Sequence, residues 1–465
     1  MSKQILQAVE LVQHELLLFS AVWLLVGAVD DLCIDLIWIA RWAFRRMTVY
    51  RNQPPLRIDQ LAPPKRSGLL AIFIPTWREA SVIGTMLAQC TQKWKGSHTR
   101  YQIYVGCYPN DPDGIAEVLR AASANQHIHL VLIAHPGPTT KADCLNRLWQ
   151  ALISDELAGG YKAKAVVLHD AEDSVHRFEL AVFDRMIEKT AAVQLPVLPI
   201  PTERSKWVSA HYCDEFAEAH GKNMVVREAI GAALPLAGVG CAIDRNVLGR
   251  IALGNRNRPF DDKSLTEDYE LGLKIGATGN RAMMARIWDD QGSLIGTKAC
   301  FPDTLHTSVR QKTRWLTGIA LAGWDRLGWS GSWAERWMLL HDRRSIFSAL
   351  VLMAAYICVV LTLILVVADI VDVYQPMPLP RYLVFTVGIN AIFRMWRMAV
   401  RAAFVRAQYG WAEAILSVPR SMIANIISIM AARRACMAYF RYRSGVPLTW
   451  DKTVHHIVPR VAQHD

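Results

Sequence analysis

Two carboxylates stand close together in the segment 169–173, directly after a short apolar run at 165–168. Asp170 and Glu172 are two residues apart, so in extended backbone their side chains point to the same side. Carboxylate oxygens are the ligands that Mg²⁺ or Mn²⁺ takes while substrate phosphates complete the coordination shell. The segment therefore predicts a divalent metal site, and the alternative is an acidic cluster that caps a helix opening at Ser174.

Two earlier apolar runs are also followed by carboxylates. Glu79 ends the segment 75–79, and Asp111 lies within 110–114. If both runs are parallel strands, their carboxyl ends lie at one edge of the sheet, where ligands of such sheets bind. We expect both side chains to face a ligand.

A further acidic pair, Glu267 and Asp268, follows Thr266 at the start of an apolar-periodic segment. A carboxylate in this position can remove a proton from a substrate hydroxyl. The same three residues also make a good helix start, which is the structural alternative.

Gln311, Arg314 and Trp315 combine an amide, a guanidinium and an indole on adjoining turns of an expected helix. Residues three and four apart share one helical face, so all three can contact one ligand. The alternative is a basic helix whose long side chains reach lipid headgroups.

These residues need a scaffold, and the pattern between residues 65 and 330 supplies one. Short apolar runs alternate there with longer mixed segments, which is typical of a βα domain with a largely parallel sheet. We expect strands at 69–74, 101–107, 129–134 and 165–168, with helices at 79–94, 114–125 and 141–157.

Taken in order, the motifs resemble those of the processive family-2 glycosyltransferases, which include the cellulose, chitin and hyaluronan synthases. The resemblance covers residues 69–315. It implies an α/β fold of the GT-A type, which binds a nucleotide sugar on a mostly parallel sheet. It also implies a divalent cofactor, Mg²⁺ or Mn²⁺.

The resemblance assigns roles to the acidic residues. Asp111 matches the first motif aspartate, which in the family contacts the nucleotide base. Asp170 and Glu172 resemble the Asp-x-Asp metal motif, with Asp173 as a rival for the second ligand position. Thr-Glu-Asp at 266–268 matches the motif whose aspartate is the general base, and we expect Glu267 and Asp268 to be the catalytic pair.

The remaining assignments concern the donor and the acceptor. Gln311, Arg314 and Trp315 match Gln-x-x-Arg-Trp, which in the family binds diphosphate and acceptor sugar. Lys141 and Asn146 resemble a Lys-x-x-x-x-Asn element near the nucleotide.

Lesser matches complete the resemblance. Pro75 and Glu79 resemble a Pro-x-x-Asn-Glu start, with Arg78 in place of the usual Asn. The segment 238–241 looks like the small-residue loop beneath the acceptor, and 450–453 is similar to a gating loop that would bring Lys452 to the diphosphate. The whole is similar to membrane glycosyltransferases of the bacteriophage adsorption protein B type.

Composition points to a membrane protein. A net charge of +11 accompanies a positive mean hydropathy and 16 Trp, which favours an inner-membrane protein over a soluble nucleic-acid binder.

We expect spans at 16–42 and 345–368, a short apolar stretch at 382–393, and an interfacial or bundle-packed helix at 411–430. Arginines after the first span place the following domain in the cytoplasm of a bacterium. The expected division is 1–64, 65–330 and 331–465.

Three aspartates interrupt the first span, and ionised groups that face lipid are unfavourable. Asp31 and Asp35 share one helical face. We expect that face to turn toward Arg394, Arg397 or Arg401 in the returning segments. The alternative is that the helix begins or ends at Asp30 and the carboxylates meet headgroup water.

These observations predict an inverting enzyme that transfers sugar from a nucleotide-diphosphate sugar, with UDP as the expected nucleotide, to a growing polysaccharide. The expected partners are the donor, a glycan acceptor, membrane lipid and an outer-membrane export protein, without nucleic acid. The alternatives are a non-processive transferase acting on a lipid and an inactive receptor or scaffold subunit. A glycosidase is disfavoured because hydrolysis needs no diphosphate-binding motif.

Overall fold

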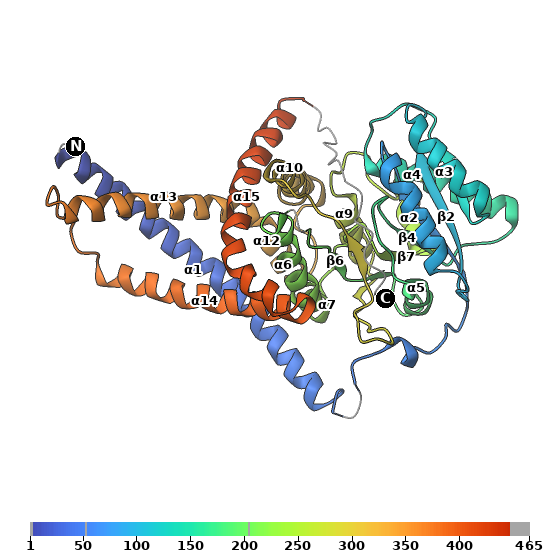
Figure 1. Ribbon diagram of the computed structural model, residues 1–465, viewed down its shortest axis with the longest axis horizontal. Coiled ribbons are helices and arrows are strands. Elements are labelled where there is room, and N and C mark those ends of the chain that lie inside the picture. Colours follow the sequence, from blue (N-terminus) through green and yellow to red (C-terminus); the bar gives the residue numbers. More distant parts are fainter. Residues whose placement is uncertain (1–2, 52–53, 203–204, 447–465) are drawn as a thin grey trace.

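The computed structural model describes residues 3–51, 54–202 and 205–446 of the chain. It contains an α/β domain at one end and an elongated bundle of long helices at the other (Figure 1). The α/β domain is built on a seven-stranded sheet with the order β3-β2-β1-β4-β7-β5-β8. The strands are β1 (Leu69–Pro75), β2 (Arg100–Cys107), β3 (Ile128–Leu132), β4 (Ala165–Leu168), β5 (Ala192–Gln194), β7 (Cys241–Asp244) and β8 (Ala282–Met284).

The sheet is mostly parallel, as the sequence predicts. The register places Ile72 opposite both Ile103 and Val167, and the exception is β7, which runs antiparallel to β4 and to β5. The four expected strands are all present. A second small sheet pairs β6 (Val197–Pro199) with β9 (Thr297–Ala299) in parallel.

Helices cover both faces of the sheet because successive strand residues alternate in direction. Ile72 and its neighbours at 70 and 74 pack under α2, α3 and α5, whereas Phe73 packs under α4, α8 and α9. The covering helices are α2 (Ala80–Lys93), α3 (Pro112–Ala124), α4 (Lys141–Gly159), α5 (Glu179–Met186), α8 (Arg245–Leu253) and α9 (Glu267–Ala277). Both faces of β1 are therefore buried, which explains its continuous apolar run.

Shorter helices connect this domain to the bundle. They include the 3₁₀ helix η1 and the π-helical segments η3 and η4. Their bounds are η1 (Ile58–Gln60), α6 (Ala210–Glu218), η3 (Ala219–Asn223), α7 (Met224–Ala229), α10 (Leu305–Leu316), η4 (Thr317–Leu321), α11 (Ala322–Leu327) and α12 (Trp333–Arg343).

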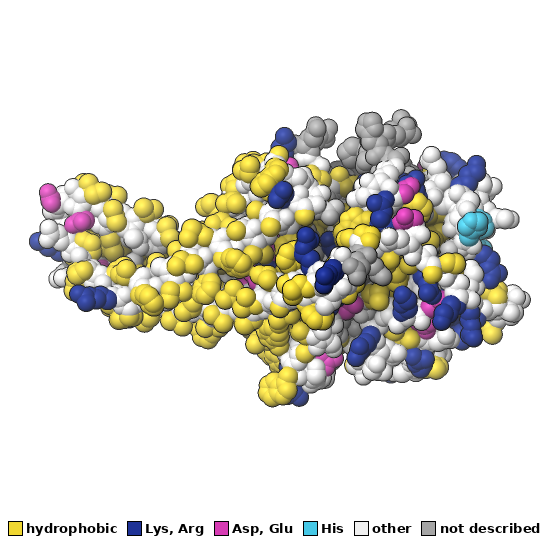
Figure 2. Space-filling view, turned by 90° about the horizontal axis from the view of Figure 1, so that it is seen from below, with side chains coloured by type: hydrophobic (Ala, Val, Ile, Leu, Met, Phe, Trp, Pro, Cys, Tyr) yellow, Lys and Arg dark blue, Asp and Glu magenta, His cyan; other side chains and the backbone are white. Residues whose placement is uncertain are grey.

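Four helices in the described ranges are long and apolar enough to cross a membrane. They are α1 (Lys3–Met47), α13 (Ser345–Ile370), α14 (Arg381–Tyr409) and α15 (Trp411–Arg443). The first three lie side by side, and α15 runs across them where the bundle meets the α/β domain (Figure 1). Hydrophobic side chains cover the bundle, whereas charged side chains gather on the α/β domain (Figure 2).

Helices α1, α14 and α15 are all longer than the sequence suggested, and α14 shows the reason. The apolar stretch at 382–393 is only the first part of α14, which continues through Arg394, Arg397 and Arg401. Arg397 and Arg401 both pair with Glu218, the latter at 3.1 Å. The helix continues because its charged half packs against α6 and not against lipid.

The aspartates of α1 face protein. Asp31 pairs with Arg397 at 3.5 Å, as expected, and also with Arg344. The shared face of Asp31 and Asp35 thus turns toward Arg397, but the direct ion pair of Asp35 is with Lys222, and its carboxylate accepts a hydrogen bond of 2.9 Å from the Trp396 indole. The alternative of a helix that starts or stops at Asp30 is wrong, because α1 runs unbroken from Lys3 to Met47.

Candidate active site

A cavity of about 130 Å³ lies at the carboxyl ends of β1 and β4, where the topology of an open parallel sheet places ligand sites. Residues from most of the separated motifs meet in its lining. The sequence-derived candidates that line it are Pro75, Glu79, Lys141, Asp170, Glu172, Asp173, Glu267, Asp268, Gln311, Arg314 and Trp315.

The turn after β4 is held by a buried histidine. His169 Nδ1 lies 3.0 Å from Asp173 Oδ2 and its Nε2 lies 2.9 Å from Glu179 Oε1. Burial by itself lowers the pKa of His169, but the two carboxylates outweigh it and raise that pKa to about 10. The histidine is therefore an imidazolium that donates to both acids and fixes the turn.

Within this turn the three acidic residues differ in their surroundings. Asp173 Oδ2 also accepts a hydrogen bond of 3.0 Å from the Asp170 backbone N–H, so this side chain shapes the turn. The Asp170 side chain is 34% exposed, and Glu172 is buried in the cavity wall. No helix opens at Ser174, whose backbone bonds to Lys298 instead, so the structural alternative for this segment is wrong.

Lys141 brings a positive charge to the centre of the cavity. It is the first residue of α4, which Thr140 caps by accepting from the Asp143 N–H at 3.2 Å. Its Nζ lies 2.5 Å from Asp170 Oδ1 and 3.4 Å from the Gly238 carbonyl. Burial would lower the pKa of Lys141, but Asp170 and the carboxylates of α9 raise it, so the ammonium stays charged.

Glu267 and Asp268 form the first turn of α9, beside this ammonium. Burial and the neighbouring Asp268 carboxylate raise the pKa of Glu267 to about 7. Burial also raises the pKa of Asp268, against the opposing effect of Lys141. Glu267 and Asp268 both open helix α9 and line the cavity, so the structural and the functional interpretations of this segment hold together. The Thr266 hydroxyl makes no capping hydrogen bond.

The backbone at Gly238 lies directly against Asp268. Gly238 has a φ of +72°, and a Cβ placed there would lie 2.5 Å from Asp268 Oδ2. Only glycine combines this left-handed backbone with so close an approach. The small-residue loop at 238–241 therefore sets the position of the carboxylate.

The third motif lies on one face of α10. Gln311, Arg314 and Trp315 all line the cavity, so this face meets a ligand site and not lipid. The Trp315 indole lies edge-on to the rings of Tyr212, Phe216 and Phe301, with centroids 6.0–6.5 Å apart. This aromatic cluster offers a surface on which a sugar ring can stack.

Asp111 and Asn146 do not line the cavity. Asp111 caps α3 by accepting from the Gly114 N–H at 3.2 Å, and it accepts from the Arg78 N–H at 2.7 Å. Asn146 donates to the Phe260 carbonyl at 2.9 Å and so holds the loop before α9. Lys452 lies outside the described residues.

Sequence reasoning missed several residues. His169 carried a signal in its position, because it directly follows a buried strand and precedes the acidic pair by one residue. Ser264, Phe216 and Phe301 also line the cavity, but no spacing in the sequence links them to the acidic motifs. They reach the cavity through tertiary packing alone.

Comparison with known proteins shows the family of the chain. The family model described as "Glycosyltransferase like family 2" matches residues 66–318, more than half of the chain. Bacteriophage adsorption protein B of Escherichia coli strain K12 is 32% identical over an alignment of 458 positions, which covers 94% of this chain. Bacteriophage N4 adsorption protein B of Escherichia coli O157:H7 gives the same figures, and the chain spans 61% of the length of each relative.

A solved structure shares the architecture. The mannosyltransferase PcManGT from Pyrobaculum calidifontis, in complex with GDP-Man and Mn²⁺, aligns with a TM-score of 0.50 at 16% identity. The alignment covers 85% of this chain and 99% of that protein. At this identity the likeness shows the fold, which is the GT-A fold. With the family match over residues 66–318, the chain belongs to glycosyltransferase family 2 and is a glycosyltransferase.

Proposed function

We propose that this protein is an inverting transferase that moves a sugar from a UDP-sugar to a growing polysaccharide at the bacterial inner membrane. One observation carries the proposal. Asp170, Asp268 and Arg314 come from three separated motifs, and all line one cavity. A metal ligand, a base and a diphosphate-binding cation are what such a displacement requires.

In the proposed reaction Asp268 Oδ removes the proton from an acceptor hydroxyl, whose oxygen then attacks the anomeric carbon. The C–O bond to the diphosphate breaks as the new one forms, so the configuration inverts. The raised pKa of Asp268 supports its role as a base, because it retains a proton better than an exposed aspartate. Burial is the main cause of that raised pKa, with the Asp170 carboxylate adding to it, and the Arg314 guanidinium stabilises the departing diphosphate.

A divalent cation fits the acidic turn. Asp170 and Glu172 supply hard oxygen ligands, and the buried Asp173 Oδ1 has no hydrogen-bond partner among the described residues. The Lys141 ammonium already lies 2.5 Å from Asp170, which shows that the position attracts positive charge. When bound, Mg²⁺ or Mn²⁺ would neutralise charge on the diphosphate. The Mn²⁺ in PcManGT supports this choice of cofactor class.

The location follows from the helices. Arg41, Arg45 and Arg46 at the end of α1 favour a cytoplasmic side for the α/β domain. We assign the membrane segments to 1–64 and 331–465 and the catalytic domain to 65–330. An outer-membrane protein that exports the polymer is the partner that this location implies. Contact between Lys452 and the diphosphate belongs to the same proposal.

The test is UDP release from a panel of UDP-sugars by purified protein with Mg²⁺ or Mn²⁺. Metal-dependent release is expected with one sugar, and Asp268→Asn should abolish it while donor binding stays within a few fold. Absence of release from every sugar would favour the inactive scaffold. Product length after incubation with radiolabelled donor separates polymer synthesis from addition of one sugar to a lipid.

A further inference from the structure

A second cavity, of about 1010 Å³, lies within the helical bundle. Its walls come mainly from α1, α13 and α14 and are apolar, with Leu24, Phe347, Val351 and Val387 among the lining residues. The surface of the same helices is hydrophobic (Figure 2). The cavity is therefore large enough for a lipid-sized molecule and lies in the part of the protein that contacts the bilayer.

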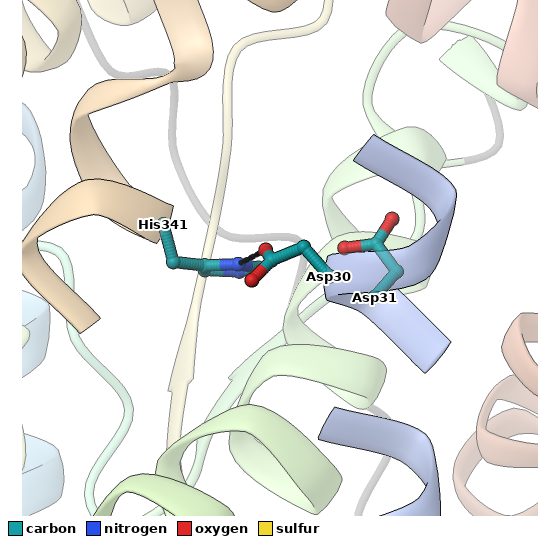
Figure 3. A group of neighbouring side chains, drawn as sticks. All are labelled: Asp30, Asp31 and His341. Carbon is teal, nitrogen blue, oxygen red and sulfur yellow. Dashed lines mark hydrogen bonds and ion pairs between the residues drawn. The ribbon is translucent and has the colours of Figure 1, made fainter. Parts of the chain in front are cut away.

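Acidic residues at the polar end of this cavity are already neutralised. Asp30 Oδ2 lies 2.7 Å from His341 Nδ1 (Figure 3). The same oxygen lies 3.2 Å from Arg344, and the Trp337 indole donates to Asp30 Oδ1. Asp31 pairs with Arg344 and Arg397. Although Asp30, Asp31 and His341 lie close enough to hold a metal, the Arg344 guanidinium already supplies the positive charge.

Arg343, in contrast, lines the cavity without a polar partner. Its side chain is only 5% exposed, and none of its three guanidinium nitrogens has a hydrogen-bond partner among the described residues. Trp324 and Trp329 pack on the guanidinium, with ring centroids at 5.3 Å and 4.7 Å. Stacking covers a face of the group but leaves its N–H edges unsatisfied, which is unfavourable for a buried charge.

A second guanidinium in the lining, like Arg343, forms no ion pair with the described residues. Arg394 donates to the Ser421 hydroxyl at 2.8 Å, and the described part of the chain offers it no carboxylate within ion-pair distance. Two arginines thus contribute positive charge to a cavity whose aspartates are already paired with other cationic side chains. The missing partner is an anion from outside the described chain.

We propose that this cavity binds an anionic membrane phospholipid, with its phosphate on Arg343 and its acyl chains along α1, α13 and α14. A guanidinium fork matches two phosphate oxygens, and the buried N–H edges of Arg343 are left unpaired beside this cavity. Arg343 also ends α12, two residues before the apolar helix α13 begins, so it lies at the depth of the headgroups. Neither free phosphate nor an uncharged lipid would satisfy both the charge and the apolar walls.

The experiment uses the full-length protein, delipidated in detergent, and measures melting temperature and lipid binding by native mass spectrometry. Three probes are added separately: phosphatidylglycerol, diacylglycerol with the same chains, and inorganic phosphate. We expect saturable binding and stabilisation by phosphatidylglycerol alone. Equal stabilisation by diacylglycerol, or binding of inorganic phosphate with the same affinity, would overturn the proposal.

Variants test whether Arg343 and Arg394 bind the lipid phosphate. Arg343→Gln should weaken phosphatidylglycerol binding by about tenfold or more. Arg336→Gln is the matched control, because Arg336 lies exposed on the same helix over the Trp333 ring at 5.9 Å. Should Arg343→Gln fail to fold, Arg394→Gln removes charge from the same cavity and should also weaken binding. Affinities equal to that of the control variant would show that the arginines do not bind the lipid.

Discussion

Substitution of Gly238 by alanine tests the position of the proposed base without touching its chemistry. Gly238 has a φ of +72°, and the added Cβ would lie 2.5 Å from Asp268 Oδ2 and 3.1 Å from its Cγ. The left-handed backbone costs an alanine about 1 kcal/mol. The contact is too short to persist, so the carboxylate must move. A displaced base is expected to lower kcat by on the order of 100-fold with little change in donor KM.

Gly231 provides the matched control for this substitution. Its φ is +76°, but a Cβ placed there meets no atom within 4 Å. Gly231→Ala should therefore lose about the same stability, a few degrees of Tm, and keep its turnover. Steady-state kinetics and thermal unfolding of both variants separate backbone strain from displacement of Asp268. Equal kcat values for the two variants would refute the argument that Gly238 positions the carboxylate.

Three further predictions concern the acidic residues. Asp268→Asn should abolish transfer in a UDP-release assay while calorimetry shows donor affinity within a few fold, and an equal loss of affinity would contradict its role as base. Asp170→Ala and Glu172→Ala should weaken Mn²⁺-dependent UDP binding, whereas Asp173→Ala should lower Tm more than affinity because it holds the turn. The acid limb of kcat/KM should lie above the ordinary titration range of an aspartate, since a base acts only when deprotonated and burial raises the pKa of Asp268.

Much of the sheet could be predicted because its signal is local. The strand at 69–74 is a continuous apolar run, and the structure buries it on both faces. The turns after β1 and β4 begin where these runs stop, so the positions of Glu79 and Asp170 at one edge follow from parallel pairing. Local sequence thus determines which residues can meet in the cavity.

Other features depend on contacts between distant residues. Strand β7 is only Cys241–Asp244, and nothing in these four residues indicates antiparallel pairing with β4. Helix α14 continues through its arginines because Arg397 and Arg401 form ion pairs with Glu218, a residue far away in the sequence. Asn146 matched a donor-binding motif by spacing, but its amide holds the Phe260 backbone. Spacing alone does not distinguish a ligand contact from a structural hydrogen bond.

Helix α6 explains how the membrane helices can influence the proposed acceptor surface. At its carboxyl end Glu218 pairs with Lys222 at 2.7 Å, and Lys222 in turn pairs with Asp35 of α1. In the same helix Phe216 packs against Trp315, with ring centroids 6.4 Å apart. Phe216 and Glu218 are two residues apart in α6, so the ion pairs to α1 and the packing against Trp315 lie within one turn of the same helix. The charges of α1 therefore help to hold the helix that contributes Phe216 to the cavity wall.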